Sequence, residues 1–302
     1  MKLTYYFALI FSLVSSCSFV LANEQESLLR SKADVLQSRL NTMMQNSASW
    51  LDNIGAEESE GASAHGYLQF SWLPRTADLD DIDTKFKVSL NLPQWNERLA
   101  LVIDNDDEDE LLLDYETDYT SVPQQGVNVA FQYIKSFSDE HQIKNRIGVS
   151  RKQFYLRSEM QFEWQVNQLR WRLQPRIDYF LQDGWGPSVK GAVSYQLESS
   201  YFSLSASWQK IQNEARSRRK VGFFHIKSTG RDQLLVSGVQ YNKSNNKEDI
   251  ANESYFISTR YRNLIYKKWM YVEVEPFIEL NQLNDFRREV GIGLSLISYY
   301  GE

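Results

Sequence analysis

Charged side chains occupy alternate positions in two consecutive segments of the sequence, residues 154–166 and 169–181. In an extended chain successive side chains point to opposite faces, so the charges share one face and aromatic or aliphatic residues share the other. The charged set is Arg157, Glu159, Glu163, Arg170, Arg172, Arg176 and Asp178. Enclosed charges of this kind can line a path that selects solutes by charge, or they can pair across strands and stiffen a narrow interior.

A tight turn at Asn167 and Gln168 folds the two segments into a hairpin in which one register satisfies both faces. The opposed pairs are then Glu163 with Arg172, Glu159 with Arg176, Arg157 with Asp178, Trp164 with Trp171, and Phe162 with Leu173. Opposite charges directly across an antiparallel pair attract, and a slip by one residue would exchange the two faces. Because the charges pair so completely, we favour the stiffening role for this set.

The length of these two strands indicates where they reside. Each has about a dozen residues, whereas strands of soluble proteins average about 5–6. A tilted strand that crosses a membrane needs about 9–11 residues with one apolar face. A basic residue at the bilayer midplane costs about 2–4 kcal/mol on the lipid face, so the charged face must be the enclosed one. The hairpin therefore predicts part of a transmembrane β-barrel.

Three glutamates on a later segment form a second candidate lining. Glu273, Glu275 and Glu279 share one face of residues 269–280. The next segment, 289–300, offers glycine and serine at the facing positions, so we expect these carboxylates to lack partners there. They are the better candidates for a solute-facing patch.

The N-terminus resembles a secretory signal. Lys2 is followed by an apolar run and by a small-residue cleavage site before Asn23, which makes residues 1–22 a signal peptide. The alternative is a lipoprotein signal in which Cys17, the only cysteine, is acylated. Cleavage after residue 22 leaves no cysteine for disulfides or metal binding. The formal net charge of −6 argues against nucleic acid as a partner.

Alternation or short apolar runs predict fourteen strands from residue 66 onward. Their approximate cores are 66–73, 84–92, 97–103, 126–136, 142–150, 153–165, 169–181, 187–197, 201–209, 220–227, 233–241, 254–262, 269–280 and 289–300. The segments 97–103, 220–227 and 233–241 alternate least clearly, so twelve strands is an alternative. Short connections alternate with longer ones along the chain, which is typical of periplasmic turns and external loops.

Residues 66–302 resemble bacterial outer-membrane β-barrel proteins as a class. Such proteins typically end in a strand with an aromatic residue near its last position, and Gly291, Leu294, Leu296 and Tyr300 approximate that pattern. Gly301 and Glu302 follow the aromatic residue, which departs from it. The resemblance implies an all-β, antiparallel, up-and-down barrel in the outer membrane, inserted by the barrel-assembly machinery.

Residues 23–65 then form a periplasmic region ahead of the barrel at 66–302. Leucine and methionine spacing in 24–46 predicts a short amphipathic α-helix, and 51–65 predicts an acidic linker. The helix is periplasmic, inserted into the lumen as a plug, or part of a coiled coil. These alternatives remain open.

Two charged clusters fall in predicted external loops. Asp106, Asp107 and Asp109 belong to an acidic run that is either solvated or bridged through divalent cations to lipopolysaccharide phosphates. Arg216, Arg218 and Arg219 are either solvated or in direct contact with those phosphates. Outer-membrane lipid and lipopolysaccharide are therefore the expected partners of these loops.

The expected role is a channel or transporter for small polar solutes, and oligomers are possible. A closed structural or assembly barrel is the alternative, and an outer-membrane lipid hydrolase is the third hypothesis. Only His65, His141 and His225 are available as imidazole bases, and neither a Gly-x-Ser-x-Gly elbow nor a paired-histidine metal motif is present. We therefore expect no catalytic residues, no metal and no cofactor.

Overall fold

The computed structural model describes residues 34–35, 37–38, 41–42, 63–76, 79, 81–92, 98–105, 127–138, 140–150, 153–214, 217–245 and 251–301. The chain divides into two units, residues 1–43 and 44–302. All six described residues of the first unit are helical, and the Thr42 hydroxyl donates a hydrogen bond to the Ser38 carbonyl oxygen at 2.8 Å. They lie inside the predicted helix, whose other residues fall outside the described part of the chain, as do the signal segment and residues 51–62. None of the described helical residues forms a helix long and apolar enough to cross a membrane.

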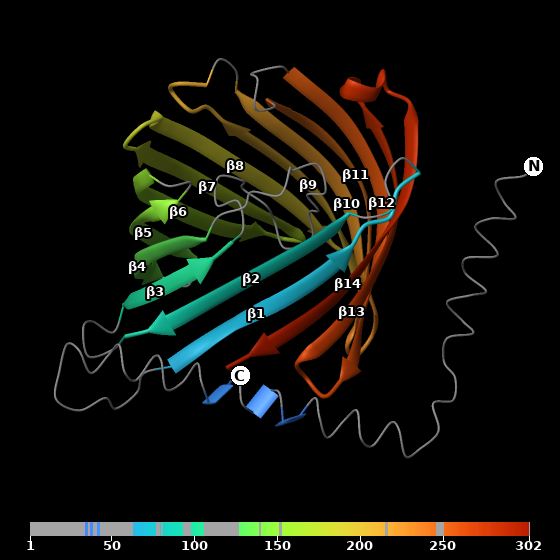
Figure 1. The fold of residues 1–302 in the computed structure, drawn as a ribbon, viewed down its shortest axis with the longest axis horizontal. Coiled ribbons are helices and arrows are strands. Elements are labelled where there is room, and N and C mark those ends of the chain that lie inside the picture. The colour runs from blue at the N-terminus through green and yellow to red at the C-terminus, as the bar shows by residue number, and fades with distance from the viewer. Residues whose placement is uncertain are drawn as a thin grey trace, which may run out of the picture. The chain divides into compact units, whose positions relative to one another are not determined.

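In the described part of the second unit, fourteen antiparallel strands close into one barrel (Figure 1). The strands are β1 (Ser63–Trp72), β2 (Ile82–Asn91), β3 (Leu99–Asp104), β4 (Asn128–Ser138), β5 (His141–Ser150), β6 (Gln153–Val166), β7 (Leu169–Phe180), β8 (Gly184–Gln196), β9 (Ser200–Gln209), β10 (Arg218–Gly230), β11 (Gln233–Asn245), β12 (Ala251–Tyr266), β13 (Met270–Asn281) and β14 (Arg288–Tyr300). Each strand pairs with its neighbours in sequence, and β1 pairs with β14. The predicted barrel is confirmed. The twelve-strand alternative is wrong, because the three poorly alternating segments form β3, β10 and β11.

The β6–β7 hairpin has the predicted register. Its Cα partners include Glu163 with Arg172, Glu159 with Arg176, Arg157 with Asp178, Trp164 with Trp171, and Phe162 with Leu173. The two indole rings stack with centroids 6.2 Å apart and planes 2° apart. Asn167 takes φ 56° in the turn, a left-handed conformation that asparagine adopts more readily than most residues.

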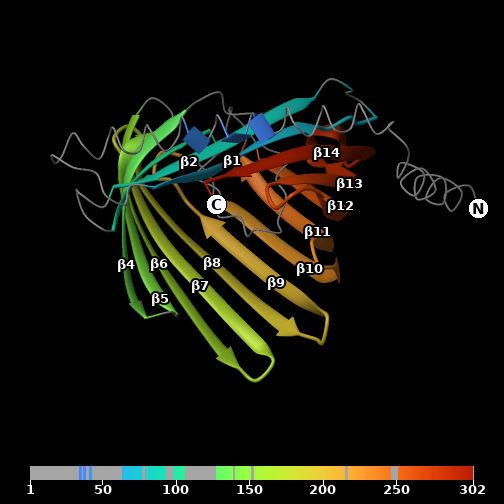
Figure 2. The same ribbon diagram turned by 90° about the horizontal axis from the view of Figure 1, so that it is seen from below.

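The two faces of the strands differ as a membrane barrel requires. On β7, Trp171, Leu173 and Ile177 are exposed, whereas Arg176 and Asp178 are buried. Because the ring is closed, the buried face is the inner one and the exposed apolar face is the outer one. Figure 2 shows the wall from β4 to β10 arching away from β1, β2 and β14. Soluble proteins bury apolar side chains instead, and this reversal suits a hydrocarbon surround.

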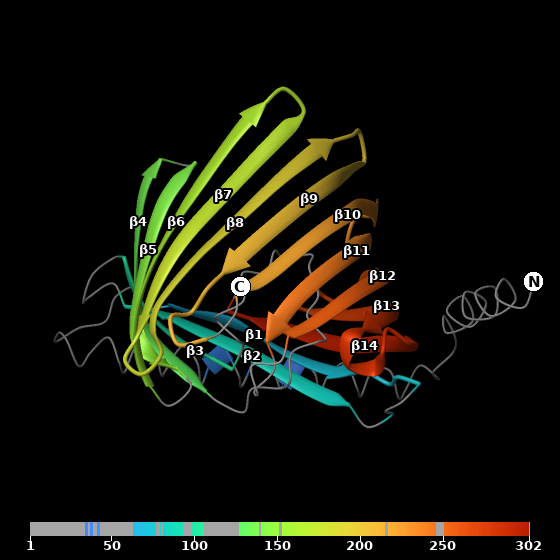
Figure 3. The same cartoon turned by 90° about the horizontal axis from the view of Figure 1, so that it is seen from above.

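The two ends of the barrel have different connections. The end named here the turn end carries the connections at 92–98, 139–140, 167–168, 197–199, 231–232 and 267–269. The opposite end, the loop end, carries 73–81, 105–127, 210–217, 246–250 and 282–287, together with two short connections at 151–152 and 181–183. Figure 3 shows the β6–β7 and β8–β9 hairpins projecting beyond the rest of the rim at the turn end.

Large aromatic side chains pack over glycines on neighbouring strands. The Phe224 ring on β10 covers Gly222 and Gly238, where a methyl group would overlap the ring. At the seam between β14 and β1, Tyr300 covers Gly66 in the same way. The Tyr300 hydroxyl donates to the Lys87 carbonyl oxygen on β2 at 2.5 Å, so one side chain ties three strands together.

Candidate functional site

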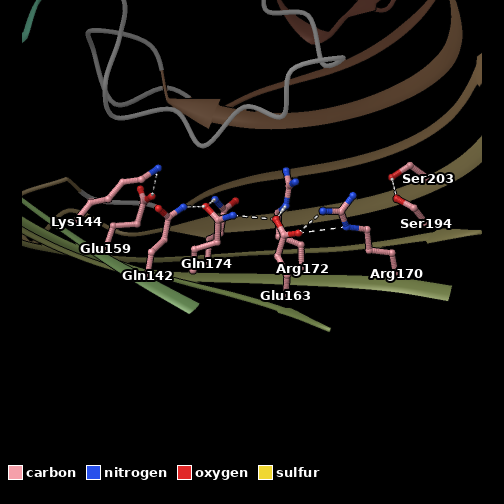
Figure 4. A network of polar contacts seen from close by, with 10 residues as sticks. Gln142, Lys144, Glu159, Glu163, Arg170, Arg172, Gln174, Ser194 and Ser203 are labelled. Atoms are coloured by element: carbon pink, nitrogen blue, oxygen red, sulfur yellow. Dashed lines mark hydrogen bonds and ion pairs between the residues drawn. The ribbon is translucent and has the colours of Figure 1, made fainter. Parts of the chain in front are cut away.

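The inner face of β5–β8 carries a row of polar side chains (Figure 4). Glu163 lies between two arginines: Arg170 Nη2 is 2.5 Å from one carboxylate oxygen, and Arg172 Nε is 2.7 Å from the other. The side chain of Gln161 donates to Glu163 at 2.8 Å and accepts a hydrogen bond from Gln142 at 2.9 Å. Amide side chains thus continue the row from the ion pairs on β6 and β7 to β5.

A second carboxylate between two arginines lies nearer the loop end. Arg157 Nε is 2.5 Å and Arg176 Nε is 3.0 Å from the two oxygens of Asp178, whose side chain is 0% exposed. The Arg157 guanidinium also lies over the Tyr155 ring at 5.3 Å. A buried charge is tolerated when it is paired and hydrogen-bonded. Both arginines form ion pairs with Asp178, and Arg157 also donates a hydrogen bond to it. These ion pairs link β6 to β7 and hold Arg157, Arg176 and Asp178 together.

One of the predicted cross-strand ion pairs, between Glu159 and Arg176, is replaced by other contacts. Glu159 faces Arg176 in register, but its carboxylate lies 3.9 Å from Lys144 on β5, while Arg176 donates to Ser188 on β8 at 3.2 Å. A long guanidinium side chain reaches past the residue directly opposite it, so register alone does not determine the ion pair.

The glutamates of β13 are paired, which corrects the expectation that they lack partners. Glu273 pairs with Arg262, and Glu275 lies 3.6 Å from Arg260. Glu279 is 3.1 Å from Arg75, which belongs to the β1–β2 connection. The partners come from β12 and from that connection. On β14, Ser295 faces Glu273 and Gly293 faces Glu275 as expected, but Glu289 faces Glu279, which corrects the expectation for that position. Alternation in residues 254–262 was the signal that would have placed the two β12 arginines opposite β13.

Interior charges are distributed unevenly around the ring. The strand register places the following groups on the inner face of β5–β8: seven cations, Lys144, Arg146, Arg157, Arg170, Arg172, Arg176 and Lys190, and three carboxylates, Glu159, Glu163 and Asp178. The inner face of β12–β14 carries two cations and four carboxylates, Arg260, Arg262, Glu273, Glu275, Glu279 and Glu289. These two walls lie across the fourteen-strand ring from each other. The β5–β8 wall is therefore cationic relative to the opposite one.

Several of these interior groups were missed by the sequence interpretation. Lys144 and Arg146 on β5 and Lys190 on β8 share the inner face with the predicted set. Arg146 donates to Gln132 on β4 at 2.6 Å. Their alternation with outward Ile147 and Val189 was a sufficient signal.

Of the residues predicted to lie in external loops, some fall outside the described part of the chain and two lie on a strand. Asp106, Asp107, Asp109 and Arg216 lie outside the described residues. Arg218 and Arg219 belong to strand β10 rather than to a loop, which corrects their placement. Arg218 pairs with Glu214 at 2.5 Å and faces Gln209 on the inner side, so it does not point toward lipid. Arg219 points outward.

The histidines form no catalytic arrangement among the described residues. His141 Nδ1 lies 2.9 Å from the Ser138 hydroxyl in the exposed β4–β5 turn. His225 stacks on Phe202 at 4.7 Å on the outer face, as its register with Phe223 predicts. No group of three or more histidine, cysteine, aspartate or glutamate residues in the described ranges could hold a metal ion.

Comparisons with known proteins identify the fold. No protein-family model and no curated protein sequence matches the chain. Among solved structures, the loop L8 deletion mutant of OmpT, an outer membrane protein of Vibrio cholerae, has a TM-score of 0.53 at 10% identity, over 80% of this chain and 99% of that one. The outer membrane channel DcaP of Acinetobacter baumannii has a TM-score of 0.50 at 8% identity, over 79% of this chain and 97% of that one. The chain therefore has the fold of bacterial outer-membrane β-barrel proteins.

Proposed function

We propose that the protein spans a bacterial outer membrane as a passive channel for small polar solutes, with the turn end in the periplasm. The observation that supports this is a closed ring of fourteen strands with apolar side chains outside and charged ones inside. Barrels of about eight strands are filled by their own side chains, whereas wider ones leave room for a path.

The excess of cations on β5–β8 makes anions the favoured solutes. Arg170 and Arg172, whose side chains are 60% and 31% exposed, share the single carboxylate of Glu163. This group keeps one net positive charge within reach of a solute. Each carboxylate of β13 has an arginine partner, and Arg75 is shared between Glu279 and Asp81. Fixed charge on a low-dielectric wall concentrates ions of opposite sign.

Planar-bilayer recording tests both parts of the proposal. Folded protein, identified by heat-modifiable electrophoretic mobility, should produce discrete current steps. Its reversal potential in a potassium chloride gradient should have the sign of chloride selectivity. Silence of folded protein in the bilayer would refute the channel, while steps without chloride preference would refute only the anion selectivity.

Paired substitutions locate the selectivity. Replacing Arg170 and Arg172 together with glutamine should move the reversal potential toward that of a cation-selective pore, because Glu163 then loses both partners. Lys135→Gln is the matched control, since Lys135 lies on the outer face of β4 over the Phe137 ring at 5.1 Å. An equal shift in the control would show that charge inside the barrel is not the cause.

A closed structural barrel is the second candidate, and one observation favours it. Tyr155, Phe180, Ala130 and Ile211 form a buried apolar cluster on the inner side near the loop end. The Gln212 backbone amide donates to the Trp185 carbonyl oxygen at 2.8 Å, which holds the β9–β10 connection over the β7–β8 turn. Side chains that fill the mouth in this way would abolish current steps, so the same recording separates the two functions.

A further inference from the structure

Two cations face each other on the outside of the barrel near the loop end. Arg219 on β10 lies directly opposite Lys243 on β11, and the odd-numbered neighbours Val221, Phe223 and Val239 on the same face are exposed. Like charges directly opposed on neighbouring strands destabilise a sheet. The opposition of Arg219 and Lys243 therefore lowers the stability of the sheet, and no contact between the two residues offsets this loss.

Among the residues that the structure describes, an acidic group pairs with only one of these cations. Glu253 on β12 forms an ion pair with Lys243 and also accepts a hydrogen bond from the Tyr241 hydroxyl. Arg219 is exposed and has no hydrogen bond or ion pair within the described part of the chain. The cluster of Arg219, Lys243 and Glu253, named here the outer basic site, keeps one net positive charge on the lipid-facing wall.

Aromatic side chains mark the depth of this site in the membrane. Trp208 on β9 lies opposite Arg219, and Tyr241 packs on Tyr255 with ring centroids 5.2 Å apart. Phe286, in the β13–β14 connection, lies 6.3 Å from Tyr255. Tryptophan and tyrosine gather where hydrocarbon meets lipid headgroups, so Arg219 is at headgroup depth.

We propose that the outer basic site binds a phosphate group of a lipid in the outer leaflet, that is, of lipopolysaccharide. A phosphate between Arg219 and Lys243 would relieve their repulsion and accept charge-assisted hydrogen bonds from both. The longer connections at the loop end favour the external leaflet over the periplasmic one. This proposal is independent of whether the barrel conducts.

Lipid binding to the folded, full-length protein in detergent tests the proposal. Native mass spectrometry should show bound bisphosphorylated lipid A, and much weaker binding of the same lipid after enzymatic removal of both phosphates. The Arg219→Gln and Lys243→Gln double variant should bind bisphosphorylated lipid A about tenfold more weakly, since at least one charge-assisted contact is lost. Equal affinity of the double variant, or equal affinity of the wild-type protein for the dephosphorylated lipid, would overturn the proposal.

Two controls keep the result interpretable. Lys227→Gln removes a cation from the same outward face of β10 at the turn end and should leave the affinity unchanged. If the glutamine variant does not fold, Arg219→Lys keeps the charge and should retain most of the binding. Binding that disappears on addition of a chelator would mean that a divalent cation bridges Glu253 to the lipid, which contradicts direct contact by Arg219 and Lys243.

Discussion

Several interior carboxylates of this barrel pair with arginines. Asp178 and Glu163 each lie between two guanidinium groups, and Glu275 receives both an Arg260 contact and a hydrogen bond from Ser258 at 2.6 Å. Removing one such carboxylate leaves a cation without its counter-charge in a poorly solvated interior. The effect of a substitution therefore depends on how buried the pair is.

Substitution of Glu275 by glutamine tests this at the residue scale. Glu275 is 1% exposed and Arg260 is also buried, so breaking the pair should lower the free energy of unfolding by about 3 kcal/mol. Glu159→Gln is the comparison, because Glu159 and its partner Lys144 are more exposed and 3.9 Å apart; we expect a loss below about 1 kcal/mol there. Urea unfolding of both variants in lipid vesicles measures the difference, and equal losses would contradict the role assigned to burial.

At the scale of elements, the sequence was sufficient to predict a strand and its pairing where the strand has two contrasting faces. The β6–β7 register follows from complementary charges on one face and apolar residues on the other. Alternation along a strand could not predict that Arg75 pairs with Glu279, because these residues are 204 positions apart and meet only once the ring has closed. Strand register also did not predict which cation pairs with Glu159, since Glu159 contacts Lys144 although it faces Arg176.

Packing between strands β10 and β11 gives a prediction for a pair of glycines. A methyl group at Gly238 would overlap the Phe224 ring, whereas one at Gly191 on β8 would enter open space. Gly238→Ala should lower the free energy of unfolding by about 1–3 kcal/mol through overpacking. Gly191→Ala should leave it unchanged or raise it slightly, because glycine loses more backbone entropy on folding. Heat-modifiable mobility against temperature reports both, and a stable Gly238 variant would mean that the ring is free to move.

For the whole molecule, the uneven charge of the two interior walls produces a prediction about salt. The Debye length is about 10 Å at 0.1 M and about 3 Å at 1 M, so a field that spans the lumen is screened at high ionic strength. Chloride selectivity, measured as the reversal potential under the same tenfold gradient, should be larger at low mean salt than at high mean salt. A selectivity that does not change with salt would indicate direct binding at one arginine rather than a field from the β5–β8 wall.

The pairing of β1 with β14 has a consequence for biogenesis. Gly66 meets Tyr300, so β1 finds its second neighbour only in β14, the last of the fourteen barrel strands in sequence order. Until then its free edge presents unsatisfied amides and carbonyls, which recruit foreign strands and promote aggregation. A polypeptide truncated before β14 cannot close the ring, because β1 then has no second partner. It should therefore remain bound to chaperones that keep unfolded chains soluble.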